Sequence, residues 1–223
     1  MRVALDFWVV IAQWPIFLTG VLWTIGLTAI SAVLGLSIGV VLGWSRANGP
    51  RWLRMLVGVY VEFIRNTPFI VQLFFIFFGL PAMGVKLSPE MASVIAMVVN
   101  LGAYSTEIAR AGIVATPKGQ IEAGLSLGLT RFHIFFWVVL PPALHKVWPA
   151  LVSQVIIVML GSAVCGQIST PELSYAANLV QSRNFRVFES YIVATLLYLL
   201  LAIALRAVLN WLGKRYLFGV RHG

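Results

Sequence analysis

Long stretches without charge decide what this chain can fold into. No charged residue lies between Asp6 and Arg46, and several later stretches are almost as apolar. A helix that crosses the hydrocarbon core of a membrane needs about 20 mostly apolar residues. The chain is 60% hydrophobic and 10% charged, whereas an average soluble domain is about 45–50% apolar and about 25% charged. This composition excludes a soluble enzyme, a disordered protein and a secreted disulfide scaffold, and it predicts an all-α membrane protein.

The apolar stretches predict five transmembrane helices. The first stretch is too long for one perpendicular helix, so Phe7–Phe17 is interpreted as an interfacial segment ahead of the first span. The five predicted spans are Leu18–Trp44, Leu56–Pro81, Met91–Thr106, Val147–Gln167 and Tyr191–Trp211. An odd number of crossings places the two termini on opposite sides of the membrane. We expect residues 1–223 to form a single membrane domain.

The distribution of basic residues predicts the orientation. Eleven lysines and arginines flank one side of the membrane: Arg46, Arg51, Arg54, Arg110, Lys118, Arg131, Lys146, Arg206, Lys214, Arg215 and Arg221. Four flank the other side: Arg2, Lys86, Arg183 and Arg186. The basic side of a membrane protein faces the cytoplasm, which makes the N-terminus periplasmic and the C-terminus cytoplasmic. The net charge of +9 is therefore attributed to topology and to membrane lipids, and no nucleic-acid partner is expected.

The loop at about 111–146, between the third and fourth spans, carries a short amphipathic segment. Gln120–Leu129 contains Ile121, Leu125 and Leu129, spaced as one apolar stripe of a helix, and Gly128 suits a turn. Such a helix either docks into a groove of a partner protein or lies flat on the membrane.

Two proline signals suggest where helices end. The aromatic segment Phe132–Leu140 is expected to stop at Pro141 and Pro142. Pro68 is expected to interrupt the second span, because proline lacks the amide hydrogen that a helix interior needs.

Three motifs, in order, resemble a known family. Glu122-Ala123-Gly124, then Gly128, then Leu140-Pro141 resembles the EAA loop of binding-protein-dependent ABC importer permeases. The segments EFIRNTPFIVQ (62–72) and NLGAYSTEIAR (100–110) resemble motifs of the polar amino-acid permeases. Asn66 stands where the family has glycine, and Gly124 where it has alanine.

The resemblance implies a five-helix permease of the type I ABC importer architecture, in the inner membrane of a bacterium. It implies a homodimer or heterodimer of permease subunits, two ATPase subunits that use ATP and Mg, and a periplasmic binding protein that delivers an amino acid. A cytoplasmic coupling (EAA) helix would contact the ATPase. The coupling residues implied are Ile121, Glu122, Ala123, Gly124, Leu125 and Gly128.

No catalytic chemistry of the chain's own is expected. A phosphate-binding loop needs Gly-x4-Gly-Lys-(Ser/Thr), but only Lys214 follows a glycine, and the residue five before Gly213 is Val208. The histidines are far apart in the sequence: His133, His145 and His222. We therefore expect no metal and no directly bound cofactor.

Polar residues inside the spans are candidates for the substrate path, because such residues usually face the interior of a helix bundle or a water-filled cavity. They are Arg65, Thr67, Pro68, Gln72, Asn100, Gln154 and Ser162. Each has an alternative structural explanation, such as an interhelical hydrogen bond or, for Arg65, an ion pair with Glu62. Glu107 and Arg110 are likewise expected to form an ion pair at the membrane surface. Relatives that take basic amino acids often have an acid at the position of Gln154, so the neutral amide favours a neutral polar or acidic substrate.

Two other functional classes remain open on the sequence alone. An ATP-independent secondary transporter or channel would need no ATPase, but five spans contain no inverted half-repeat. The other class is a membrane enzyme or a structural membrane scaffold. Against it, the sequence contains no convergent set of catalytic acids, histidines or metal ligands.

Overall fold

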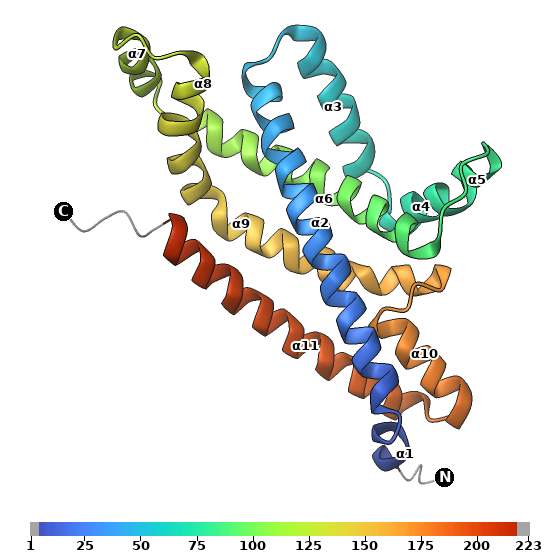
Figure 1. Cartoon of the computed structure of the whole chain (residues 1–223). Coiled ribbons are helices and arrows are strands. Elements are labelled where there is room, and N and C mark those ends of the chain that lie inside the picture. The colour runs from blue at the N-terminus through green and yellow to red at the C-terminus, as the bar shows by residue number, and fades with distance from the viewer. Residues whose placement is uncertain (1–4, 218–223) are drawn as a thin grey trace. The chain divides into compact units, whose positions relative to one another are not determined.

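The computed structural model describes residues 5–217, which form helices joined by short connections, and it contains no β-strand in that range (Figure 1). Arg2, Arg221 and His222, which entered the sequence analysis, lie outside the described residues. The α-helices are α1 (Phe7–Ile11), α2 (Trp14–Asn48), α3 (Arg51–Arg65), α4 (Phe69–Phe74), α5 (Leu80–Ala82), α6 (Pro89–Val114), α7 (Lys118–Ser126), α8 (Arg131–His133), α9 (Leu140–Gly161), α10 (Leu173–Asn184) and α11 (Val187–Leu212). Three π-helical segments (Phe75–Gly79, Ile134–Val139, Gly213–Leu217) and one 3₁₀ segment (Ser162–Ile168) continue them.

The long helices agree with the predicted spans but extend beyond them. Four helical stretches in the described part of the chain are long and apolar enough to cross a membrane: Trp14–Asn48, Pro89–Val114, Arg131–Ile168 and Val187–Tyr216. The bent pair Arg51–Arg65 and Phe69–Ala82 makes a fifth if it counts as one span. The break falls at Pro68, as predicted. The helices extend beyond the apolar stretches because charged residues can continue a helix past the hydrocarbon core.

Three glycines form a close seam between α2 and α6 within the second unit. Three glycines of α2 lie so close to α6 that an added Cβ would approach it within 3 Å. The contacts pair Gly35 with Leu101, Gly39 with Ser105 and Gly43 with Ala109. Both residue numbers rise together, so α2 and α6 run in the same direction. Two spans with the same direction need a return crossing between them, and the bent pair of α3 with α4–α5 is the stretch of chain that makes a fifth span if it counts as one.

One sequence prediction is wrong. Pro141 and Pro142 do not stop the aromatic segment, because the chain is helical from Arg131 to Ile168. The π-helical turns Ile134–Val139 end at Val139, and one residue, Leu140, separates them from the two prolines. A π-helical turn shifts the backbone hydrogen bonds by one residue, and such turns are one way in which a helix continues past residues that cannot donate the usual bond.

The described residues form two compact units, each assembled from separate stretches of chain. The first unit contains the residues up to Ala32, Thr67–Val98 and Ile156–Leu205; the second contains Val33–Asn66, Val99–Val155 and the residues from Arg206. In the first unit, α1 and the start of α2 pack on α10 through Val10, Phe17, Leu173, Ala177 and Val180. In the second, Ile113 packs with Ile134, Phe135, Val139 and Ala143. The sequence analysis did not predict α10.

Candidate functional site

The helix of the EAA-like loop is α7, which begins at Lys118 and ends at Ser126. Its end is set by Gly128, whose φ of +73° is adopted most readily by glycine. The amide of Leu129 donates to the carbonyl of Gly124 at 3.1 Å, and that of Gly128 to Leu125 at 2.9 Å. These bonds satisfy carbonyls that a helix end leaves free, so the turn holds α7 in a defined position.

The predicted stripe of three residues is shortened to two, because α7 ends at Ser126 and Leu129 follows the turn. The two that remain do not share one environment. Ile121 is partly buried against the core cluster of Ile113, Ile134 and Phe135, whereas Leu125 is 51% exposed. The buried Gly124 faces Ile134, where an added Cβ would lie 3.0 Å from a side-chain carbon. Glu122 and Ala123 are exposed. The outward face therefore offers Glu122, Ala123 and Leu125, while Ile121 and Gly124 fix α7 to its own unit.

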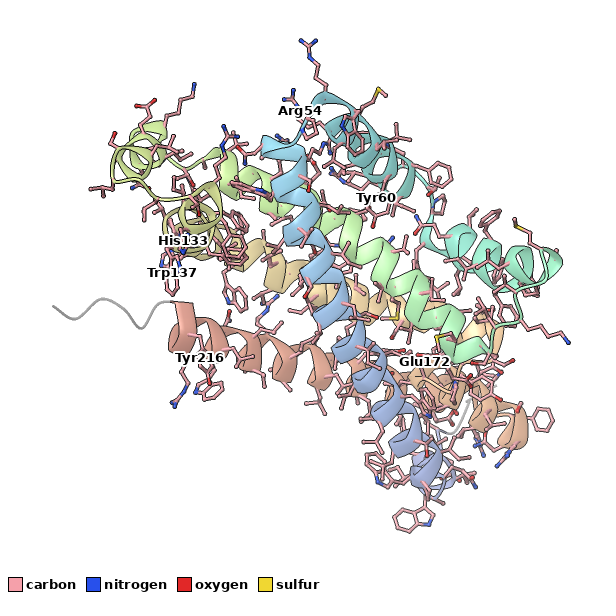
Figure 2. The ribbon with its side chains drawn as sticks, turned by 45° about the horizontal axis from the view of Figure 1, so that its top comes forward. Arg54, Tyr60, His133, Trp137, Glu172 and Tyr216 are labelled. Carbon is pink, nitrogen blue, oxygen red and sulfur yellow. The ribbon has the colours of Figure 1, made fainter. Side chains whose placement is uncertain are left out.

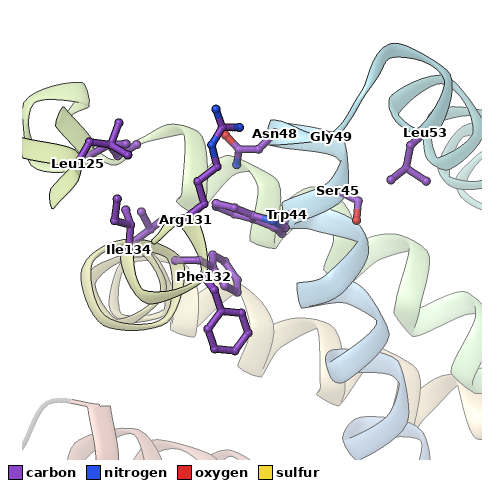
Figure 3. Close-up of a pocket in the computed structure, with 12 residues that line it drawn as sticks. Trp44, Ser45, Asn48, Gly49, Leu53, Leu125, Arg131, Phe132 and Ile134 are labelled. Atoms are coloured by element: carbon purple, nitrogen blue, oxygen red, sulfur yellow. The ribbon is translucent and has the colours of Figure 1, made fainter. Parts of the chain in front are cut away.

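An apolar recess of about 500 Å³ lies beside α7 (Figure 3). Trp44, at the end of α2, points toward the helix that carries Phe132 and Ile134, and its ring lies 4.2 Å from that of Phe135. Leu125 and Arg131 border the opening. These contacts join the end of α2 to the loop within the second unit.

Four charged side chains form a network at the same end of the second unit. The predicted Glu107–Arg110 pair is present, with the Arg110 guanidinium 3.1 Å from the carboxylate. Arg46, in the last turn of α2, also donates to Glu107 and lies 3.8 Å from Glu62. The network ties α2, α3 and α6 together. The sequence analysis missed Arg46, which is 61 residues from Glu107.

The predicted substrate residues around the helix break have local partners. Arg65 lies over the ring of Tyr104 at 5.4 Å, while Glu62, its expected ion-pair partner, accepts from the amide of Asn66 at 3.1 Å. The buried Gln72 donates to the carbonyl and hydroxyl oxygens of Thr67 at 3.0 and 2.9 Å. Pro68 caps α4 with extended backbone. The side chain of Gln72 therefore bridges the break at Pro68 by binding Thr67 on the other side of it.

The remaining three candidates differ in their hydrogen bonding. Ser162 is fully buried, and its hydroxyl donates to the carbonyl of Met159 at 2.6 Å. Asn100 is partly buried. Gln154 is 9% exposed, and no hydrogen bond to its side-chain amide occurs within residues 5–217. Arg65, Asn100 and Gln154 belong to the second unit, and Thr67, Pro68, Gln72 and Ser162 to the first.

A buried acid organises the first unit. Glu172 is fully buried at the start of α10 (Figure 2) and accepts four hydrogen bonds. The donors are the amides of Ser174 and Tyr175 at 2.9 and 2.8 Å, the Ser174 hydroxyl at 2.6 Å and the Tyr198 hydroxyl. Burial raises the pKa of Glu172 above its usual value, against the opposing effect of these donors. The carboxyl joins α10 to α11.

Comparison with known proteins identifies the family. Residues 35–218 match the model of the binding-protein-dependent transport system inner membrane component. The chain belongs to this family of transport permeases. It is 37% identical to the L-cystine transport system permease TcyB of Bacillus subtilis strain 168 over 91% of this chain and 87% of the relative. It is 32% identical to the glutamine transport system permease GlnP of Escherichia coli K12 over 90% and 93%. A crystal structure of an amino acid ABC transporter, solved with histidines, superposes with a TM-score of 0.85 at 31% identity, covering 95% of this chain and 99% of that one.

Family membership confirms several sequence predictions for this permease. It is an all-helical, multi-pass inner-membrane component of a binding-protein-dependent transporter, with the architecture of type I ABC importer permeases. Proteins of this family are membrane components, distinct from the ATPase subunit. The individual coupling and substrate residues stay predictions.

Two features of the permease were missed. A cavity of about 340 Å³ in the first unit is lined in part by the polar residues Gln167, Ser174, Tyr175 and Asn178. The spacing of Ser174 and Asn178 places them on one face of a helix, but no spacing in the sequence brings Gln167 to them. The close packing of α2 on α6 was also missed, although a signal for it exists in the sequence. Glycines lie four residues apart at 35, 39 and 43, a spacing typical of close helix packing in membranes.

Proposed function

We propose that this permease is a subunit of an ATP-driven importer of polar amino acids. It pairs with a second permease subunit, as homodimer or heterodimer, and works with two ATPase subunits and a periplasmic binding protein. Residues 1–223 act as one permease domain, with a periplasmic N-terminus and a cytoplasmic C-terminus. The ATPase uses ATP and Mg, and this chain binds no cofactor and catalyses no reaction.

One observation carries the proposal: α7, the helix of the loop that resembles the family motif, is packed on one face and exposed on the other. The turn at Gly128 and the inward contacts of Gly124 and Ile121 fix its position. Its outward residues, Glu122, Ala123 and Leu125, are free to meet a groove of an ATPase. A helix fixed on one face and exposed on the other can transmit a displacement, which is what ATP-driven alternation of the permease requires.

The names of the relatives support the proposed substrate class. Their names specify cystine and glutamine, and the structural neighbour is an amino acid transporter. We propose that the predicted polar residues contact the amino acid: Arg65, Asn100 and Gln154 in the second unit, and Thr67, Pro68, Gln72 and Ser162 in the first. Gln154 is the strongest candidate for direct contact, because its amide is buried in a spanning helix and has hydrogen-bonding capacity to spare.

Uptake into proteoliposomes tests the function. The permease is reconstituted with its ATPase and binding protein, and uptake of labelled glutamine, cystine, glutamate and histidine is measured with ATP, without ATP and with a non-hydrolysable analogue. We expect accumulation against a gradient only with ATP and the binding protein. Equal uptake without ATP would instead support the alternative, a secondary transporter or channel.

Reversing the charge of Glu122 should uncouple the transporter. Glu122→Lys places a positive charge on the outward face of α7, so we expect co-purification of the ATPase and ATP-driven uptake to fall at least about tenfold, a loss of about 1.4 kcal/mol. Gln120→Lys, also exposed on α7, is the control and should lose much less. Normal ATPase binding and uptake by Glu122→Lys would refute the coupling role of this residue.

A charge at position 154 should change substrate preference. Gln154→Glu introduces an acid into the proposed path, so uptake of cationic amino acids should rise relative to glutamine, while glutamate uptake should fall. Competition assays with unlabelled arginine and glutamate measure the ratio. Ser153→Glu, on the adjacent exposed position of α9, is the control. An unchanged ratio in Gln154→Glu would remove Gln154 from the path.

A further inference from the structure

Four arginines surround a shallow recess where α2, α3 and α6 meet in the second unit. The recess has a volume of about 500 Å³ and is lined by Arg46, Arg51, Arg54, Met55 and Arg110. Figure 2 shows Arg54 near the start of α3. Guanidinium groups bind phosphate oxygens through pairs of parallel hydrogen bonds, so this residue set suits a phosphate-class anion.

The charges of the recess are only partly neutralised. Arg46 and Arg110 share the carboxylate of Glu107, and Arg46 also lies near Glu62. No acidic side chain within residues 5–217 forms a salt bridge with Arg51 or Arg54. Two positive charges therefore remain available to a ligand.

The start of α3 adds to the positive potential. Arg51 is the first residue of this 15-residue helix, and its N-cap, Pro50, makes no side-chain capping bond. The free amide groups and the helix dipole at an N-terminus favour an anion. This contribution is independent of the arginine side chains.

An apolar strip leads away from the recess along α3. Its five members are each more than half exposed and share one helix face: Trp52, Met55, Leu56, Val59 and Phe63. Met55 also lines the recess, so the strip and the charged site are continuous. From Trp52 to Phe63 the strip extends about 16 Å at about 1.5 Å per residue, close to the roughly 15 Å depth of hydrocarbon in one leaflet.

We propose that this recess binds the headgroup of an anionic phospholipid, whose acyl chain lies along the strip on α3. A free anion would use the arginines but not the strip, and an acidic protein segment would not need an apolar surface as long as one leaflet. Basic pockets at the cytoplasmic ends of spanning helices are known to hold anionic headgroups. The placement in the cytoplasmic leaflet rests on the orientation given under the proposed function.

Lipid retention tests the site without requiring transport. The purified permease complex is exchanged into micelles that contain phosphatidylglycerol and phosphatidylcholine, and the bound lipids are counted by native mass spectrometry. We expect preferential retention of phosphatidylglycerol. The double variant Arg51→Gln/Arg54→Gln should weaken it about 30-fold, which corresponds to about 2 kcal/mol, and Arg51→Lys/Arg54→Lys should restore most of it.

The matched control removes two other charges from the same unit. Lys146 and Lys214 are exposed and lie outside the recess, so Lys146→Gln/Lys214→Gln should retain phosphatidylglycerol like the wild type. Equal loss in this control would show only a general charge effect and overturn the site. Inorganic phosphate should not displace the lipid at millimolar concentration; if it does, the recess binds small anions. Loss of the ATPase from Arg51→Gln/Arg54→Gln with lipid retained would assign the recess to a protein contact instead.

These readouts separate the two proposals. Failure of ATP-driven uptake in the wild type would contradict the proposed function and leave lipid retention unaffected. Equal retention of both lipids by an active transporter would contradict the lipid site alone.

Discussion

Replacing Glu172 by alanine is expected to destabilise the permease more than any other single change considered for the first unit. Four donors point at a carboxyl with no exposed surface. Alanine removes the acceptor of the Ser174 and Tyr175 amides and of the Tyr198 hydroxyl, while the Ser174 hydroxyl keeps the carbonyl of Ala163 at 2.7 Å. Each unsatisfied buried donor costs about 1–3 kcal/mol, and relaxation recovers part of this. We expect a loss of about 3–5 kcal/mol in the free energy of unfolding, measured by thermal unfolding of the detergent-solubilised protein.

Glutamine at position 172 separates charge from hydrogen bonding. The amides of Ser174 and Tyr175 donate to different oxygens of Glu172. Glu172→Gln keeps one acceptor oxygen, which serves one of these two amides, so we expect a smaller loss than for alanine. Because the folded-state pKa of Glu172 is raised, its stabilising effect is complete below the unfolded pKa of about 4.3 and declines as the pH rises through the folded pKa. The glutamine variant should lack this decline. Wild-type stability of Glu172→Ala would show that the buried network contributes nothing.

Enlarging Gly39 should separate α2 from α6. An added Cβ would lie 2.3 Å from the Cβ of Ser105 and 2.9 Å from its carbonyl carbon, so neither a rotamer change nor a small shift relieves the clash. Overpacking of this kind costs about 1–3 kcal/mol for small additions and more for large ones. We expect Gly39→Ala to lose about 2 kcal/mol and Gly39→Leu to fail to reach the membrane in folded form, measured as the monodisperse yield after solubilisation.

Gly26 provides the matched control on the same helix. No atom lies within 4 Å of a Cβ added there, so Gly26→Leu should fold normally and gain slightly from the better helix propensity of leucine. Equal yields for Gly39→Leu and Gly26→Leu would contradict the close seam. A low yield for both would indicate that glycine is needed in α2 for a reason other than packing.

Local signals in the sequence predicted the parts of the fold that depend on neighbouring residues. The apolar stretches gave the spans, Pro68 marked the break between α3 and α4, and Gly128 marked the turn after α7. Each of these predictions depends on the chemistry of one residue or on the length of an apolar stretch. The expected stop at Pro141 failed because the π-helical turns before it, which no residue pattern announces, let the helix continue.

The candidate site was less predictable, since its contacts join distant parts of the chain. The spacing of Glu107 and Arg110 indicated their ion pair, but nothing in the sequence pointed to Arg46 as the third member. The sequence analysis did not single out Glu172, whose partners Ser174 and Tyr198 come from α10 and α11. Burial, the property that makes Glu172 important, arises only from tertiary packing.

The brevity of the connection between α6 and α7 has a mechanical consequence. Only three residues separate Val114 from Lys118, and two of them are held by the hydrogen bonds from Ala115 to Ala111 and from Thr116 to Ile113. A connection this short spans at most about 10 Å, so a push that displaces α7 would be passed on to α6. Because the glycine seam packs α6 closely against α2, such a push would move the two helices together.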